Sequence, residues 1–151
     1  MKHLLLQSIA CCAALLPFSQ AEARTYGGFA PGKTFTLTVT EKVTKKFVLS
    51  DVTKNVAVPG GIPNFEVGQA VTFTIGPKGQ LTAEGMSIPF EEAVANLNEY
   101  WIPPTWDNPS GDLGQVTKNW RNQPRKVFLS FGKLKFVGLT PTTFLVTYTL
   151  K

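Results

Sequence analysis

Large apolar side chains alternate with threonine in the stretch Thr34-Phe35-Thr36-Leu37-Thr38-Val39-Thr40. Successive side chains of a β-strand point to opposite faces, so this period of two places the apolar residues on one face and the threonines on the other. The pattern predicts a half-buried strand. It keeps its parity at Val43, Phe47 and Leu49, where Lys45-Lys46 indicates a turn or an edge.

The same alternation returns in the stretch Val71-Thr72-Phe73-Thr74-Ile75, after a loop at Pro59–Asn64. The turn residues Gly76-Pro77-Lys78-Gly79 follow directly, and they lead to a second strand that begins near Gln80-Leu81. Two alternating segments joined by so short a turn predict a β-hairpin.

Two further strands are predicted near the end of the sequence. Residues 127, 129 and 131 are apolar, but Leu134 and Phe136 continue the alternation on even positions. The phase slips at Gly132, which predicts a β-bulge there, because glycine accommodates an extra residue most easily. The last strand carries apolar side chains on one face over residues 144–150.

One short helix is predicted near 90–101. Phe90, Val94, Leu97 and Trp101 have helical spacing, and they are followed by Ile102-Pro103-Pro104, which ends a helix. We expect this helix to cover one end or edge of the sheet. The segment from Pro103 to about Pro124 is expected to be irregular.

These elements predict a mainly β fold, a small antiparallel barrel or sandwich with one short helix. A Greek-key or OB-like barrel fits the pattern, but the phrase Phe65–Phe73 is too general to indicate a family. A single core is expected, and its predicted members are Leu37, Val71, Phe73, Val127, Leu129, Phe144, Val146 and Tyr148.

The first 23 residues have the layout of a secretory signal peptide. Lys2 and His3 precede a mostly apolar run, and Ala21 and Ala23 occupy the −3 and −1 positions of a cleavage site before Arg24. A membrane anchor is the alternative, but the run is shorter than the roughly 20 residues that span a bilayer. Lipidation at Cys11 is a second alternative. We therefore predict an exported protein of the periplasm, the envelope or the extracellular space.

The predicted organisation is a signal peptide over 1–23, a flexible lead-in over 24–32 and a single β-domain over 33–151. Cleavage would remove Cys11, Cys12 and His3, which are the only cysteines and the only histidine. The mature chain would then lack a thiol nucleophile, a histidine base and a Cys/His zinc site. This composition argues against an enzyme. A hydrolase that uses Glu84, Asp107 or Asp112 stays open, although their spacing does not support one.

No cofactor or metal is predicted. The segment Gly27–Thr34 matches the G-x-x-x-x-G-K-[ST] phosphate-binding loop letter for letter. Such a loop requires a strand before it and a helix after it, whereas here a predicted strand begins at Thr34. The match is therefore interpreted as chance, and no nucleotide partner is expected. The acidic residues near Asp107 do not have EF-hand spacing.

The predicted binding site lies in the segment 100–126, which contains all three tryptophans. Aromatic faces beside cations can stack on sugar rings or bury into a protein partner. The alternative is that the tryptophans fill the protein's own core. The candidate binding residues are Trp106, Lys118, Trp120, Arg121, Arg125 and Lys126.

The net charge is +5 and stays +5 after cleavage, with 14 basic and nine acidic residues. This charge favours anionic partners such as lipid headgroups, acidic glycans or nucleic acid. The alternative is ordinary solubility charge, which needs no partner. The predicted function is an exported non-catalytic binding or accessory module that contacts an anionic glycan, an envelope component or a protein. The first alternative is a structural or assembly subunit of the envelope. The next alternatives are a small hydrolase and a small outer-membrane barrel.

Overall fold

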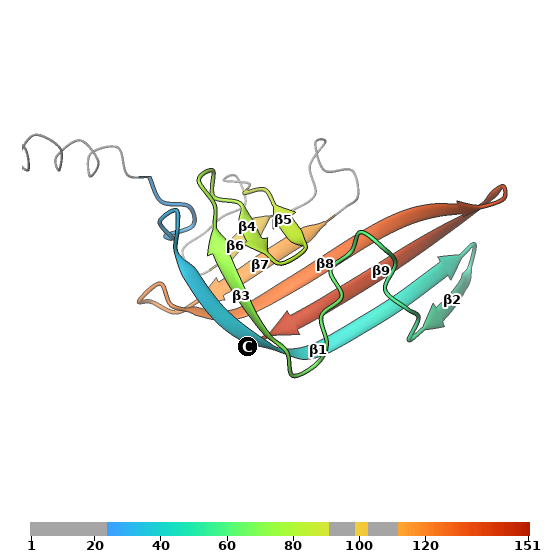
Figure 1. Ribbon diagram of the computed structural model, residues 1–151, viewed down its shortest axis with the longest axis horizontal. Coiled ribbons are helices and arrows are strands. Elements are labelled where there is room, and N and C mark those ends of the chain that lie inside the picture. The colour runs from blue at the N-terminus through green and yellow to red at the C-terminus, as the bar shows by residue number, and fades with distance from the viewer. Residues whose placement is uncertain (1–23, 91–98, 103–111) are drawn as a thin grey trace, which may run out of the picture.

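The computed structural model describes residues 24–90, 99–102 and 112–151, and it confirms the mainly β fold. The described residues form one antiparallel sheet of nine strands and contain no helix. The sheet curls into a half-barrel (Figure 1). The strands are β1 (Thr34–Val48), β2 (Asp51–Lys54), β3 (Ala70–Ile75), β4 (Leu81–Ala83), β5 (Met86–Ile88), β6 (Glu99–Ile102), β7 (Leu113–Lys118), β8 (Pro124–Val137) and β9 (Thr140–Leu150).

Strand β1 holds the two parts of the sheet together. The strand order is β5-β4-β3-β1-β9-β8-β7-β6, and β2 pairs with the far end of β1. The first residues of β1 pair with β3, and its later residues pair with β9. The register shifts between Val39 and Glu41, which is where a bulge bends the strand from one part to the other. Lys45-Lys46 is therefore neither a turn nor an edge, since it lies between β2 and β9.

The core fills the concave side of the half-barrel. Of the predicted core residues, Val71, Phe73, Val127, Leu129, Val146 and Tyr148 are buried as expected, and Leu37 is half-buried against them. Phe144 is also half-buried, but it lies outside this cluster. The loop after β2 closes over the core, because the hydroxyl of Tyr148 donates a hydrogen bond of 2.6 Å to the carbonyl oxygen of Pro63.

Two aromatic residues of the segment 24–32, which was predicted as a flexible lead-in, pack on the core. Tyr26 and Phe29 are buried and exchange two backbone hydrogen bonds, of 2.7 and 2.9 Å. Phe29 stacks on Phe35 of β1, with 6.0 Å between the ring centroids. The residues that match the phosphate-loop motif, Gly27–Thr34, thus form a turn packed on the core through Phe29, and this turn continues into strand β1 at Thr34.

Two sequence-based predictions need correction between residues 90 and 118. Most of the predicted helix near 90–101 lies outside the described residues, but its end is the strand β6. The segment expected to be irregular contains the strand β7. Its buried positions are Gly114, Val116 and Lys118, so only one of three is a large apolar residue. The period-two signal is therefore absent, although the strand is present.

The predicted bulge at Gly132 is wrong. Strand β8 pairs with β9 without a shift from Val127 to Val137, and Gly132 lies opposite Leu145. The apolar side chains change from one face of the sheet to the other at this residue, while the backbone register continues. The slip in the apolar pattern of β8 therefore has another cause: the apolar side chains move to the other face of the sheet at Gly132.

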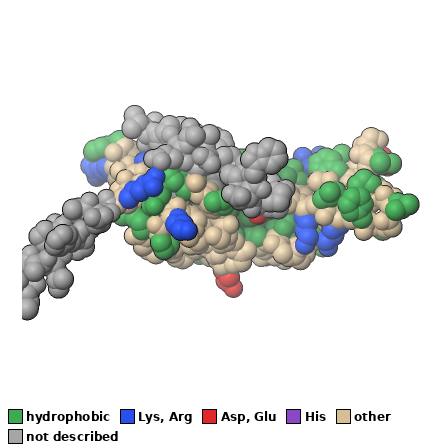
Figure 2. Space-filling model, turned by 90° about the horizontal axis from the view of Figure 1, so that it is seen from above, with side chains coloured by type: hydrophobic (Ala, Val, Ile, Leu, Met, Phe, Trp, Pro, Cys, Tyr) green, Lys and Arg blue, Asp and Glu red, His purple; other side chains and the backbone are tan. Residues whose placement is uncertain are grey.

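Strands β1, β8 and β9 extend past the core and form, with β2, a projecting end of the sheet that we call the arm, residues 45–54 and 133–144 (Figure 1). Hydrophobic side chains and lysines both gather at this end in the space-filling view (Figure 2). Across the arm the strand order is β2-β1-β9-β8.

Candidate functional site

The candidate binding residues converge only in part. Trp106 lies outside the described residues, as do the side chains of Tyr100 and Trp101. The remaining five candidates lie on β7, on β8 and on the turn between these strands. That turn, residues 119–123, is the centre of the candidate site.

The side chain of Asn119 fixes the shape of this turn. Its Oδ1 accepts hydrogen bonds from the backbone amides of Arg121 and Gln123, both at 2.9 Å. Its Nδ2 donates to Oε1 of Gln123 at 2.9 Å. Asn122 adopts a left-handed φ of 58°, which asparagine tolerates better than most residues. The first residue of the turn, Asn119, therefore fixes the backbone on both sides of its tip.

Trp120 and Arg121 project from this tip. Trp120 is 82% exposed, which is unusual for a residue type that is highly buried on average. The guanidinium of Arg121 lies over the indole, 4.5 Å from its ring centroid. Such cation–π stacking keeps the two side chains together without covering the outer face of the indole. A rigid aromatic plane with a cation beside it can stack on a sugar ring and pair with an anion.

Lys118 has a different role from the one predicted. Only 6% of the residue is exposed, its Nζ donates a hydrogen bond to the carbonyl oxygen of Gly27, and it lies 5.4 Å from the ring centroid of Phe29. Burial lowers the pKa of this ammonium group below its ordinary value. Lys118 faces the protein, so it does not contribute to an exposed binding surface.

Arg125 and Lys126 are exposed on the first residues of β8. Together with Thr117 and Lys151 they line a hollow of about 270 Å³ next to the turn. Lys151 is a cation that sequence reasoning missed, because it joins the site only through pairing at the end of the sheet, where its backbone exchanges two 2.9 Å hydrogen bonds with Thr38. The site thus has exposed positive charge from the turn after β7, from β8 and from the end of β9.

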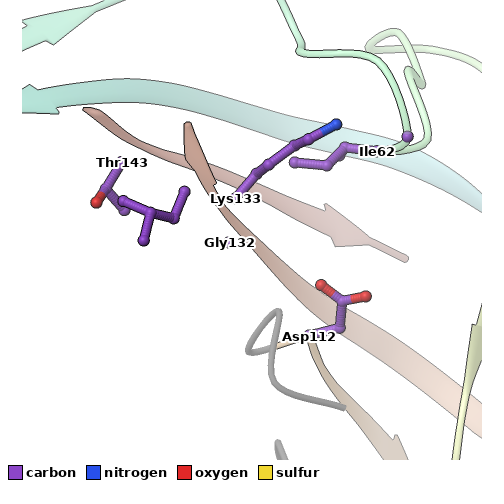
Figure 3. A pocket seen from close by; sticks show the side chains of 7 residues that line it. Ile62, Asp112, Gly132, Lys133 and Thr143 are labelled. Carbon is purple, nitrogen blue, oxygen red and sulfur yellow. The ribbon is translucent and has the colours of Figure 1, made fainter. Parts of the chain in front are cut away.

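A second hollow, of about 480 Å³, lies where the loop after β2 meets β8 (Figure 3). Its polar side chains are Asp112, Lys133 and Thr143, and Gly132 forms part of its floor. Lys133 points towards Ile62 and donates a hydrogen bond to the carbonyl oxygen of Gly60. This lysine therefore links the loop to the sheet.

Among the described residues, no group of three His, Cys, Asp or Glu side chains is placed to hold a metal ion. In the same residues, no helix is long and apolar enough to cross a membrane. Comparisons with protein-family models, with curated proteins and with solved structures found no match to this chain.

Proposed function

We propose that this protein is an exported, non-catalytic binding module that contacts an anionic, carbohydrate-bearing partner through the turn at Trp120. The observation that carries the proposal is the pairing of a largely exposed indole with a stacked guanidinium, on a turn whose shape is supported by hydrogen bonds with the side chain of Asn119. A preformed aromatic plane loses little conformational entropy on binding, so its contact area converts efficiently into affinity.

The neighbouring charges support an anionic partner. Arg121, Arg125 and Lys126 are exposed, and Lys151 lies with the last two around one hollow. A ligand with sugar rings and carboxylate or sulfate groups offers a flat face to Trp120 and charges to these cations. Export is proposed from the signal-peptide layout of residues 1–23.

The experiment measures binding of the purified protein to a panel of neutral and acidic polysaccharides over a range of salt concentrations. Trp120→Ala should weaken binding roughly ten-fold at every salt concentration, because aromatic stacking is not screened by ions. Arg121→Gln together with Lys126→Gln should weaken binding at low salt and flatten the salt dependence.

The matched control is Lys33→Gln with Lys78→Gln, which removes the same charge from exposed residues outside the site. This pair should leave the affinity within about threefold, since neither lysine lies on the turn or lines the hollow and exposed charges are screened by salt. If Trp120→Ala lowers the melting temperature and changes no binding, the tryptophan serves the fold and the proposal fails. The alternative of a structural subunit of the envelope would then be favoured.

A further inference from the structure

The arm has apolar side chains on both faces of the sheet. Val48, Val137 and Phe144 lie on the core-side face, where they line a hollow, and other apolar side chains lie on the outer face. On β8, Leu129 and Phe131 are buried in the core, whereas Leu134 is 57% and Phe136 is 65% exposed. Cross-strand partners share a face of a sheet. The register aligns Leu134 with Thr143, Thr143 with Phe47, and Phe47 with Val52. An apolar row with one threonine therefore crosses all four strands of the arm on its outer face.

The exposed apolar side chains of the described residues are concentrated in this one place. Eight large hydrophobic residues are strongly exposed, and all but Val67 and Trp120 belong to the arm. The six in the arm are Leu49, Val52, Leu134, Phe136, Val137 and Leu139. Scattered single residues of this kind are normal, but a contiguous group marks an interaction surface.

The most exposed of these residues form the tips of the arm. Leu139, at the turn between β8 and β9, is 98% exposed, and Leu49, at the turn between β1 and β2, is 80% exposed. The two turns lie at the same end of the molecule, because Val48 pairs with Thr142 (Figure 1). Leu49 also has a left-handed φ of 55°, which is uncommon for leucine. The arm therefore ends in two projecting leucines.

Lysines lie behind the tips. The arm contains Lys45, Lys46, Lys54, Lys133 and Lys135, and its one acidic residue is Asp51. Lys46 is three residues from Leu49 and Lys135 is four from Leu139, which corresponds to about 10–13 Å along an extended strand. The arm thus has apolar side chains at its tips and positive charge about 10–13 Å behind them, a spacing close to the depth of a lipid headgroup layer.

We propose that the arm docks on an anionic lipid bilayer, with Leu49 and Leu139 inserted at the headgroup–acyl boundary and the lysines against the anionic headgroups. Apolar side chains gain free energy by leaving water, and each lysine near an anionic membrane surface adds to the attraction. Charge disfavours a second copy of this chain as the partner, since two arms would bring ten lysines together. An anionic bilayer supplies an apolar layer for the two leucines and negative charge for the five lysines, against which the arm has only Asp51.

This surface is separate from the proposed carbohydrate site. The turn at Trp120 precedes β8 and Leu139 follows it, so the 14 residues of that strand lie between them, on the order of 45 Å. A protein docked on a membrane through the arm would present the Trp120 turn away from the lipid. The two proposals can therefore fail independently.

The test is co-sedimentation of the full chain with large unilamellar vesicles of phosphatidylcholine and phosphatidylglycerol at 70:30, compared with pure phosphatidylcholine. The protein should bind the anionic vesicles more tightly. Leu49→Ser with Leu139→Ser should reduce the affinity about ten-fold or more at every salt concentration. Lys54→Gln with Lys135→Gln should reduce it about 25-fold at low salt, roughly five-fold for each lysine, and much less at 0.5 M salt.

The control pair Lys33→Gln with Lys78→Gln changes the net charge equally and should alter vesicle affinity less than about threefold, and Trp120→Ala should leave it unchanged. All variants share the apolar run in residues 4–18, so differences between them report on the arm. Because both leucines are exposed, their replacement should not lower the melting temperature. Three results would each overturn the proposal. The leucine variant could bind the vesicles as tightly as the unchanged protein, or the control pair could weaken binding as much as the Lys54 and Lys135 changes do. The protein could also form a dimer in solution that the leucine changes dissociate.

Discussion

The ammonium group of Lys118 donates a hydrogen bond to the carbonyl oxygen of Gly27, although the two residues are 91 positions apart in the sequence. This contact joins β7 to the packed turn that precedes β1. It also shows that Lys118, which was predicted to bind a partner, instead stabilises the fold. A buried lysine needs a partner for its charge, and here a backbone oxygen and the face of Phe29 serve that purpose.

We expect Lys118→Ala to lower stability without changing ligand binding. The substitution leaves the half-buried carbonyl oxygen of Gly27 without this partner. We therefore expect a loss at the lower end of the about 1–3 kcal/mol that an unsatisfied buried polar group costs. Urea denaturation measures the loss. Lys126→Ala, an exposed lysine on β8, is the control and should change the free energy of unfolding by less than about 0.5 kcal/mol. Equal losses would mean that Lys118 is not held in the interior.

The core strand β3 provides a test of the assigned faces. Phe73 is fully buried and stacks on Phe35, with 5.3 Å between ring centroids. Phe73→Ala should cost about 3–5 kcal/mol, which is a large part of the stability of a small domain. Thr72, its neighbour on the opposite face, makes one exposed hydrogen bond of 2.9 Å with Thr36. Thr72→Ala should therefore cost about 1 kcal/mol or less, and a comparable loss would show that the parity of β3 is reversed.

The hairpin turn after β3 packs tightly against Tyr26. Gly79 has a φ of 79°, and a Cβ at this position would overlap the ring of Tyr26. Gly138 has a similar φ of 65° but no heavy atom within 4 Å of the corresponding Cβ. Both substitutions to alanine carry backbone strain, so the difference between them measures the overlap. We expect Gly79→Ala to lower the melting temperature clearly more than Gly138→Ala does. Equal changes would place Tyr26 away from the turn.

Tyr148 should make stability depend on pH in the alkaline range. Burial raises the pKa of its hydroxyl, the hydrogen bond from the amide of Phe65 lowers it, and the nearby carboxylate of Glu66 raises it, with a net increase. The unfolded state therefore loses this proton first, at about pH 10. The contribution to stability is complete below that pH and is lost as the pH rises through the raised pKa.

Tyr148→Phe should flatten this dependence in urea denaturation between pH 8 and pH 11. It should also lower stability at pH 7 by about 1–3 kcal/mol, because the carbonyl oxygen of Pro63 and the amide of Phe65 lose their buried partner. The lowered pKa of Lys118 acts in the opposite direction, since stability rises as the pH passes through it towards the unfolded value. That effect is present in both proteins, so it cancels in the difference. Parallel pH curves would contradict the prediction.

Processing is tested by N-terminal sequencing of the exported protein. The small residues Ala21 and Ala23 predict a mature N-terminus at Arg24. Replacing Ala23 with a bulky residue should block cleavage and shift the accumulated protein to the uncleaved size on a gel. A start at a lipid-modified Cys11 would instead make the protein membrane-anchored and would refute the prediction.

The sequence by itself determined the strands with a regular period of two. The alternation in β1, β3 and β9 predicts both the strand and the side that is buried, because every second residue shares a face. It also determined that Trp120 and Arg121 are neighbours. It did not reveal β7, whose inward positions include a glycine and a lysine, and it could not place Lys151 beside Lys126.

Only the tertiary structure decided what covers each strand where the alternation breaks or where a charged residue is buried. At Gly132 the sequence contains a plain phase slip, which a bulge and a change of apolar face explain equally well. The paired register of β8 and β9 distinguishes the two, since it continues without a shift. Likewise, the charge of Lys118 suggests an exposed side chain until the turn at Gly27 is seen to cover it. A pattern along one strand determines which residues lie together on a face, but what covers that face comes from segments far away in the sequence.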